Sequence, residues 1–198
     1  MNELNEALFL WINATTQAPT LTVITAKFFA GYAVLLIPLT LLKGWLRGDE
    51  ATRKLMLEGA AAGLAALLVA QFIGLVWPHP RPFALGIGNQ LIPHEPNASF
   101  PSDHLTLVWA VSFSFLMHRQ TRMTGLLLTL LGLPIAWARI YLGVHWPLDM
   151  LGAACVSLLS AWLCMGAQQG VIEPIYPKVN GFYKWLFAPL IRRGWVLK

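Results

Sequence analysis

Two short segments of the chain place ionisable side chains beside strongly apolar runs. The first is Pro101–His104, and the second runs from Arg139 through His145 to Asp149. A charged group beside hydrocarbon is costly, so a cluster of such groups next to membrane-spanning segments predicts a functional site. With Arg81 added, these are side-chain types that handle phosphate, and they predict an integral membrane phosphatase.

Hydrolysis of a phosphate ester or anhydride needs cations for the nonbridging oxygens, a nucleophile and an acid for the leaving group. Arg81 and Arg139 carry planar guanidinium groups that bind phosphate oxygens in pairs. Ser102 and the backbone N–H groups of Asp103 and His104 begin an apolar span, and a helix N-terminus favours an anion. Serine is also a common helix cap, and the two roles are compatible.

The histidines provide covalent and acid-base chemistry. His145 and Asp149 lie four residues apart, which puts them on one face if a helix begins at Pro147. The carboxylate can hold one ring nitrogen protonated and leave the other free to attack phosphorus. His104 is expected to protonate the departing oxygen and then to activate water. We predict that this chemistry requires neither a metal nor a cofactor.

The composition predicts a membrane protein with a single domain, residues 1–198. The chain is 57% hydrophobic and only 12% charged, whereas a soluble globular domain carries about 25% charged residues. The net charge of +5 could suggest a nucleic-acid partner. However, the basic residues lie in short loops and in the tail, so membrane topology explains them and we expect no nucleic-acid partner. Cys155 and Cys164 fall in one predicted helix, beyond disulfide reach.

Five apolar stretches approach the roughly 20 residues needed to cross a bilayer. They cover about 21–43, 55–77, 104–118, 123–141 and 147–166, and the third is short. An amphipathic segment before them predicts an N-terminal interfacial helix within residues 1–18. Residues 78–103 are rich in proline and form an outer loop, and residues 167–198 form a cytoplasmic tail on the membrane surface. The expected fold is an all-α integral membrane bundle of about five transmembrane helices plus the interfacial helix.

Lys and Arg are distributed unevenly between the two ends of these spans. One end has Lys43, Arg47, Arg53 and Lys54 between spans one and two, Arg119 and Arg122 between spans three and four, and Lys178, Lys184, Arg192, Arg193 and Lys198 after span five. Basic residues near the other end are Lys27, Arg81 and Arg139. Because cytoplasmic connections carry the excess of Lys and Arg, we predict a cytoplasmic C-terminus and a site on the outer face.

In their order along the chain, these residues resemble the three-part signature of the type-2 phosphatidic acid phosphatase superfamily. Its elements here are Arg81-Pro82, Pro101–His104, and the run from Arg139 to His145 to Asp149, over about residues 55–166. The resemblance implies a helical membrane fold with a periplasmic or extracellular site. It also implies individual roles: His145 as nucleophile, Asp149 as its partner, His104 as acid, and Arg81, Ser102 and Arg139 as phosphate ligands.

Three positions depart from the family pattern. Gly74 stands where a lysine is usual, Asp103 replaces a glycine, and Ala138 replaces a serine. With the His79–Phe83 and Phe100–His104 runs, these changes resemble the bacitracin-resistance subgroup of bacterial undecaprenyl-diphosphate phosphatases. Asp103 is then a phosphate-binding position through its backbone N–H, and its carboxylate is expected to turn toward Arg81, Arg139 or water.

The subgroup implies hydrolysis of undecaprenyl diphosphate to the monophosphate and phosphate, through a phosphohistidine, in recycling of the cell-wall lipid carrier. The expected partners are membrane lipid and a polyprenyl diphosphate, in the bacterial cytoplasmic (inner) membrane; oligomeric state is left open. The alternatives are a lipid phosphotransferase, or a phosphatidic acid or phosphatidylglycerophosphate phosphatase. A non-catalytic transporter or scaffold is disfavoured because His104, His145 and Asp149 are all present. His79 lies beside Arg81, where it could touch a second phosphate, but it is interpreted as a solvated loop histidine. His94 and Asn97 are interpreted as ordinary loop residues and His118 as an interfacial one.

Overall fold

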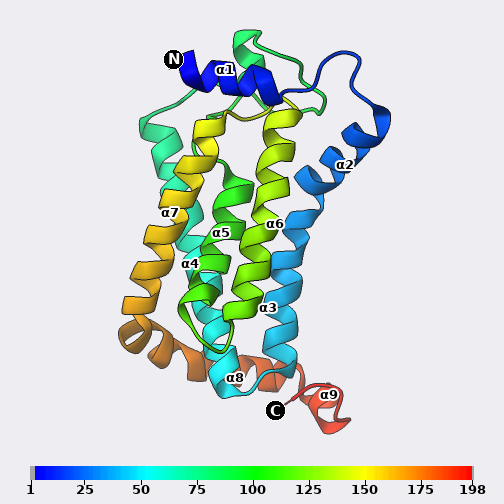
Figure 1. Ribbon diagram of the computed structural model, residues 1–198. Coiled ribbons are helices and arrows are strands. Elements are labelled where there is room, and N and C mark those ends of the chain that lie inside the picture. The colour runs from blue at the N-terminus through cyan, green and yellow to red at the C-terminus, as the bar shows by residue number, and fades with distance from the viewer. Residues whose placement is uncertain (1–2, 198) are drawn as a thin grey trace.

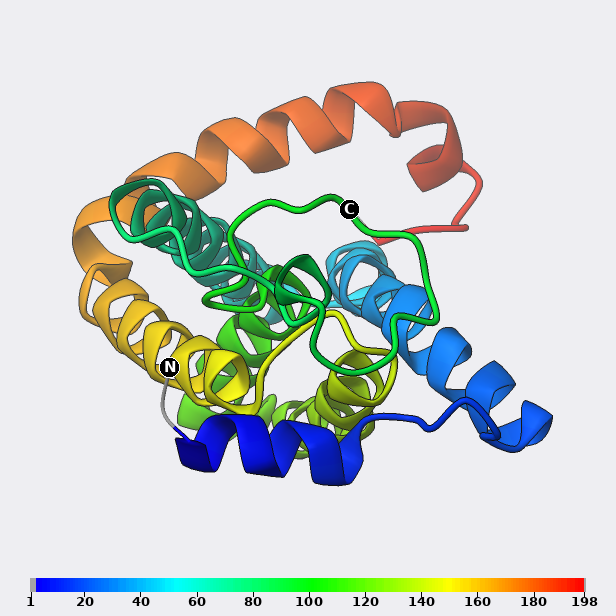
Figure 2. The same cartoon turned by 90° about the horizontal axis from the view of Figure 1, so that it is seen from above.

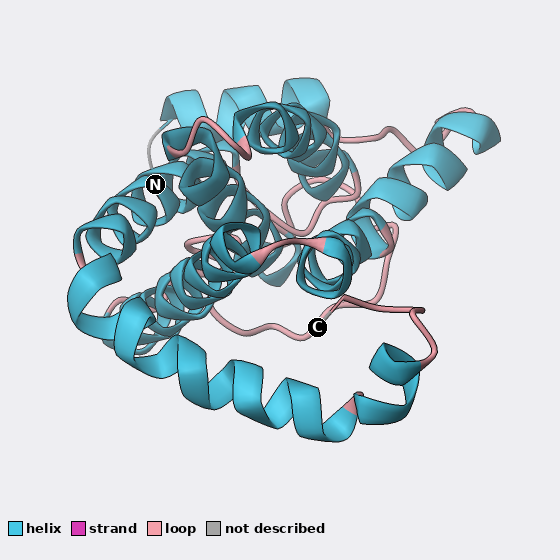
Figure 3. Cartoon of the chain, turned by 90° about the horizontal axis from the view of Figure 1, so that it is seen from below, coloured by secondary structure: helices cyan, strands magenta, loops and turns pink. Residues whose placement is uncertain are grey.

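The computed structural model describes residues 3–197. Over this range the chain folds into helices joined by loops (Figures 1 and 3). Met1, Asn2 and Lys198, which belong to the predicted N-terminal segment and tail, lie outside the described residues. Four helical segments that are long and apolar enough to cross a membrane lie side by side with a shorter apolar helix and form a bundle (Figure 1).

The predicted spans match the helices of this bundle. The helices are α2 (Thr20–Gly31), η1 (Ala33–Leu35) and α3 (Leu36–Arg47), which together make the first crossing, then α4 (Glu50–Val76), α5 (Asp103–Met117), α6 (Arg122–Tyr141) and α7 (Pro147–Gly166). Four of the crossings are long and apolar enough to span a membrane, and α5 is a shorter apolar helix. The predicted fold class is therefore confirmed, with the first span broken by one 3-10 turn.

Helix α5 forms the centre of the bundle and packs against α4, α6 and α7. Its apolar residues Leu105, Val108 and Phe115 are completely buried. At about 1.5 Å per residue, a 15-residue helix falls short of the roughly 30 Å hydrocarbon core. The neighbouring helices surround α5 and separate it from lipid, so α5 does not need to match the thickness of the bilayer. Its first turn directly follows the polar α4–α5 loop.

The end of the bundle nearest the N-terminus, predicted to be the outer end, is covered by α1 (Glu3–Ile12) and by the loop between α4 and α5 (Figures 1 and 2). Phe9 of α1 is buried and its ring lies 5.0 Å from that of Trp146, whereas Trp11 is 83% exposed. This arrangement fits the predicted interfacial helix. Asn13 joins three segments, because its Nδ2 donates at 3.0 Å to the carbonyl oxygens of Asn89 and Tyr141.

The opposite end is crossed by the tail, which is more helical than its prolines suggested. It consists of η3 (Gln168–Ile172), α8 (Glu173–Leu186) and α9 (Ala188–Arg192) (Figure 1). Pro174 lies in the first turn of α8, where its missing N–H breaks no hydrogen bond within the helix. The buried Arg53 holds the tail in place, since its Nη2 donates to the carbonyl of Leu197 at 2.8 Å.

Candidate active site

Four parts of the chain meet at the outer end of the bundle: the α4–α5 loop, the start of α5, the end of α6 and the start of α7. Helix α7 begins at Pro147, as predicted, and the Asp149 carboxylate accepts a hydrogen bond from the Trp146 N–H at 2.8 Å. The preceding turn passes through Gly143, whose φ is +81°. These two features fix the position of His145 between α6 and α7.

His145 and Asp149 form the pair that their spacing predicted. The Nδ1 atom of His145 lies 3.1 Å from Asp149 Oδ2, and both side chains are buried. Since the carboxylate is an acceptor, we assign the ring proton to Nδ1. The lone pair of His145 is therefore on Nε2, the atom that faces away from the carboxylate.

Both predicted phosphate-binding arginines converge on that nitrogen. Arg81 Nη1 lies 3.1 Å from His145 Nε2, and Arg139 Nη2 lies 3.4 Å from it. Both guanidinium groups are buried. Arg81 also donates to the carbonyl oxygen of Val144 at 2.7 Å, which ties it to the residue before His145. Two cations thus flank the atom expected to attack phosphorus.

This environment keeps His145 neutral. Burial lowers the pKa of the His145 imidazole well below the ordinary value of 6.5, and the positive charges of Arg139 and Arg81 lower it further. A neutral imidazole has the free lone pair that nucleophilic attack requires. The buried site therefore favours the reactive form of the side chain at neutral pH.

Ser102 immediately precedes α5 but does not cap it. Its side chain makes no capping hydrogen bond, and the buried hydroxyl has no partner among residues 3–197. The Nε atom of Arg139 is also buried and unpartnered within that range. Buried polar groups are normally satisfied, so two orphaned donors call for an explanation. Phosphate oxygens are acceptors that suit both, as the predicted role of Ser102 requires.

His104 and Asp103 occupy the first turn of α5. His104 is half-buried and interacts electrostatically with Arg139, His94 and Arg81. The carboxylate of Asp103 accepts a hydrogen bond from Gln71 Nε2 at 2.9 Å. Gln71 reaches this carboxylate because α4 packs closely on α5. The charge of Asp103 also acts on Arg81 and Arg139, so its expected turn toward an arginine or water stays a prediction.

Three residues that the sequence interpretation set aside or overlooked belong to the site. Ser99 Oγ donates to Asp149 Oδ2 at 2.5 Å. Asn97 Oδ1 accepts from Arg81 Nε at 3.0 Å and Nη2 at 2.8 Å. The available signal was only their position, a few residues before Pro101–His104.

The third is His94, whose Nε2 lies 3.0 Å from Arg139 Nη2. Its ring centroid is 6.2 Å from that of His145. The interpretation of His94 as an ordinary loop histidine was therefore wrong. His79, by contrast, packs edge-on against Trp77 and makes no side-chain hydrogen bond to the site residues.

Comparison with known proteins identifies the family. The family model of the PAP2 superfamily matches residues 55–173. The chain belongs to the PAP2 superfamily. It is 38% identical to YbjG of Escherichia coli (strain K12), a provisionally named undecaprenyl-diphosphatase, over 99% of this chain and 98% of that protein. It is 34% identical to the undecaprenyl-diphosphatase BcrC of Bacillus subtilis (strain 168), over 84% of each chain.

Two solved structures of PAP2 proteins share the fold. LpxE of Aquifex aeolicus superposes with a TM-score of 0.68 at 24% identity, over 82% of this chain and 95% of that one. The transmembrane PAP2-type phosphatidylglycerolphosphate phosphatase of Bacillus subtilis gives 0.60 at 19% identity, over 86% and 89%. Together with the apolar helices, these neighbours establish a multi-pass membrane PAP2 protein.

The PAP2 residues are not arranged to hold a metal. Within residues 3–197, no group of three or more His, Cys, Asp or Glu side chains is arranged to hold an ion. The cluster around His145 instead carries the two guanidinium groups of Arg81 and Arg139. Such a donor-rich set suits an anion rather than a cation.

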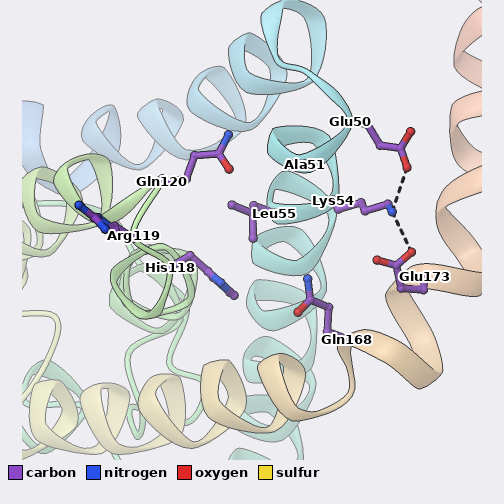
Figure 4. A pocket seen from close by; sticks show the side chains of 9 residues that line it. All are labelled: Glu50, Ala51, Lys54, Leu55, His118, Arg119, Gln120, Gln168 and Glu173. Carbon is purple, nitrogen blue, oxygen red and sulfur yellow. Dashed lines mark hydrogen bonds and ion pairs between the residues drawn. The ribbon is translucent and has the colours of Figure 1, made fainter.

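A pocket of about 600 Å³ lies at the opposite end of the PAP2 bundle. Figure 4 shows Lys54 between Glu50 and Glu173, with nitrogen-to-oxygen distances of 2.9 and 2.8 Å. Its ammonium is thus neutralised by two carboxylates. His118 also lines this pocket and lies 2.7 Å from the buried carboxylate of Glu58. The pocket is far from His145 and does not contribute to the candidate active site.

Proposed function

We propose that the chain hydrolyses undecaprenyl diphosphate to undecaprenyl phosphate and inorganic phosphate, and so recycles the lipid carrier of cell-wall synthesis. The observation that carries the proposal is His145 Nε2, which lies within 3.4 Å of two buried arginine side chains. Family membership and the names of its relatives at 34–38% identity support the same activity. The apolar bundle suits a polyprenyl tail, and the polar end suits its diphosphate headgroup.

In the proposed first step, the Nε2 lone pair of His145 attacks the terminal phosphorus. The bond from that phosphorus to the bridging oxygen breaks, and His104 gives this oxygen a proton as undecaprenyl phosphate leaves. Asp149 keeps the proton on Nδ1 and stabilises the charge that develops on the ring. Arg81 and Arg139 neutralise the nonbridging oxygens, where negative charge concentrates.

In the second step, a water molecule attacks the phosphorus of the phosphohistidine. His104, now neutral, accepts a proton from this water, and the bond between phosphorus and His145 Nε2 breaks. Inorganic phosphate leaves and His145 returns to its starting state. The Ser102 hydroxyl and the backbone N–H groups that begin α5 bind phosphate oxygens in both steps.

The test is phosphate release from undecaprenyl diphosphate by purified protein in detergent with EDTA. Wild type should release phosphate and form an acid-labile phosphoenzyme, whereas His145→Ala should do neither. Ser112→Ala is the control, because Ser112 is buried in α5 and its hydroxyl donates to the backbone of its own helix. Absence of release from folded wild type would contradict the proposal, and assays with phosphatidylglycerophosphate or a phosphate acceptor would then test the alternatives.

We also propose that the site faces outward and that the C-terminus is cytoplasmic. The excess of Lys and Arg at the end crossed by the tail supports this orientation. In a Cys155→Ser, Cys164→Ser background, Q90C should react with a membrane-impermeant maleimide in intact spheroplasts. K178C should react only after lysis. The reverse pattern would contradict the orientation without affecting the proposed chemistry.

A further inference from the structure

His94 is held in one orientation at the edge of the site. Its Nδ1 lies 3.0 Å from the carbonyl oxygen of Glu95, and its Nε2 lies 3.0 Å from Arg139 Nη2. The carbonyl can only accept a hydrogen bond, so the proton belongs on Nδ1. Nε2 therefore receives a hydrogen bond from Arg139 and carries a lone pair.

The same nitrogen of Arg139 faces both imidazoles. Arg139 Nη2 is 3.0 Å from His94 Nε2 and 3.4 Å from His145 Nε2. A phosphate oxygen that binds Arg139 while its phosphorus is attacked by His145 must come close to His94 as well. A lone pair on His94 Nε2 would repel that oxygen, whereas a proton there would form a hydrogen bond with it.

His94 also lies where a second phosphate group would extend. His145 is 2% exposed and lies deep in the site, whereas His94 is half-buried. His94 lines an open hollow of about 590 Å³ together with Gln90, Glu95 and Asn97. A terminal phosphate on His145 therefore leaves the lipid-linked phosphate on the side where His94 stands.

We infer that His94 is a further substrate-contacting residue. When the diphosphate headgroup binds, Arg139 Nη2 donates to a phosphate oxygen instead of to His94 Nε2, and Nε2 takes up a proton from solvent and donates a hydrogen bond to the lipid-linked phosphate. This inference rests on the proposed function. A lipid monophosphate cannot form this hydrogen bond while its single phosphate group lies at His145, because it has no second phosphate group to extend toward His94. His94 thus favours the diphosphate substrate.

The charges around His94 explain why proton uptake accompanies binding. Burial lowers the pKa of His94 in the substrate-free protein, and the positive charges of Arg81 and Arg139 lower it further. Asp103, on α5, acts in the opposite direction, and the imidazoles of His104 and His145 also face it. A bound diphosphate brings negative charge that offsets the two arginines and favours the protonated ring.

The first test compares wild type with His94→Gln, His94→Lys and the control Ser112→Ala, which removes a buried hydroxyl that bonds to the backbone of its own helix. KM for undecaprenyl diphosphate is measured between pH 5.5 and 8.5. His94→Gln should raise KM by about 10- to 100-fold at the acidic end, the range for a hydrogen bond to a charged group, with little change in kcat. His94→Lys should keep a low KM that no longer depends on pH, and Ser112→Ala should resemble wild type.

The second test needs no turnover. Binding of inorganic diphosphate is measured by calorimetry in buffers of different ionisation enthalpy, which reports the protons taken up. Wild type should take up a proton that His94→Gln does not. If wild type binds diphosphate in this way but does not hydrolyse the lipid, the proposed function fails while the contact stands. Equal proton uptake in both proteins, or an unchanged KM with a lower kcat in His94→Gln, would overturn the inference.

Discussion

Ser99 in the outer loop is joined to Asp149 in α7 by a hydrogen bond of 2.5 Å from its hydroxyl to Oδ2. The same oxygen of Asp149 also faces His145 Nδ1 and accepts from the Trp146 backbone. Ser99 and Asp149 are both completely buried. A loop residue 50 positions earlier in the chain therefore orients the carboxylate that orients the nucleophile.

Replacement of this serine tests its role as a positioning residue. Ser99→Ala removes a hydrogen bond to a charged group, worth about 1.5–3 kcal/mol, so kcat should fall by about 10- to 100-fold with KM nearly unchanged. Ser112→Ala is the control, because Ser112 is also buried but bonds only to the backbone of its own helix. Steady-state kinetics that show the same kcat for both variants would contradict the positioning role.

Asp149→Asn keeps the shape of the side chain but removes its charge. The amide oxygen can still accept from Trp146, Ser99 and His145 Nδ1, so the fold should survive, but the negative charge that stabilises the imidazolium as it forms is lost. By analogy with other carboxylate-oriented histidines, kcat should fall by about 10³- to 10⁴-fold. Rapid-quench measurement of the acid-labile phosphoenzyme should show slow formation, and a normal burst would rule out this role.

The lowered pKa of His145 predicts tolerance of mild acid. In the proposed mechanism the neutral ring is the nucleophile, and its pKa lies well below 6.5. Protonation of His145 should therefore begin to lower kcat/KM only below pH 6.5. A plot of log kcat/KM against pH checks this expectation. An acidic limb centred at or above 6.5 would show that the ring is protonated as easily as an exposed histidine.

The same shift makes stability depend on pH. Below about pH 6.5 the unfolded chain binds a proton at His145 that the folded protein does not bind, so stability falls as the pH decreases. Thermal unfolding in detergent between pH 7.5 and 5 should show a decrease in Tm that is smaller in His145→Ala. An equal decrease in both proteins would assign the effect to other groups.

The turn at Gly143 should be far less tolerant of substitution than a similar turn in the outer loop. Gly143 and Gly86 both have positive φ, and a left-handed residue other than glycine costs about 1–2 kcal/mol. A Cβ at Gly143 would also collide with the carbonyl oxygen of Asn89, whereas at Gly86 nothing lies within 4 Å. Gly143→Ala should displace His145 and give a kcat about 100-fold lower than that of Gly86→Ala. Steady-state kinetics that give the same kcat for both variants would contradict this prediction.

The buried Glu58 predicts a stability effect remote from the chemistry. Its Oε1 lies 2.7 Å from His118, and its Oε2 has no partner in the described part of the chain. His118→Ala leaves Glu58 Oε1 with the 3.3 Å hydrogen bond from Ser114 and should cost about 1–3 kcal/mol of stability, as for a buried polar group that loses a partner. Thermal unfolding should show a large loss of Tm that is partly restored in the double variant Glu58→Gln, His118→Ala. A normal Tm in the single variant would mean that the pair contributes little.

Several features of this protein are determined by the sequence itself. The lengths of the apolar runs predict most of the spans, because four of the helices are long and apolar enough to match the hydrocarbon thickness on their own. The first residue of α7 follows from Pro147, and the His145–Asp149 pair follows from helical spacing. Such properties depend on residues close together in the chain, so they can be read without knowledge of the fold.

Only the tertiary structure decided which distant groups meet. His94, Asn97 and Ser99 lie in a loop with no periodicity, so no pattern could show that they contact Arg139, Arg81 and Asp149. Likewise, the carboxylate of Asp103 turned to Gln71 because α4 packs beside α5. Contacts between segments far apart in sequence depend on how the helices pack, and the packing is a property of the whole chain.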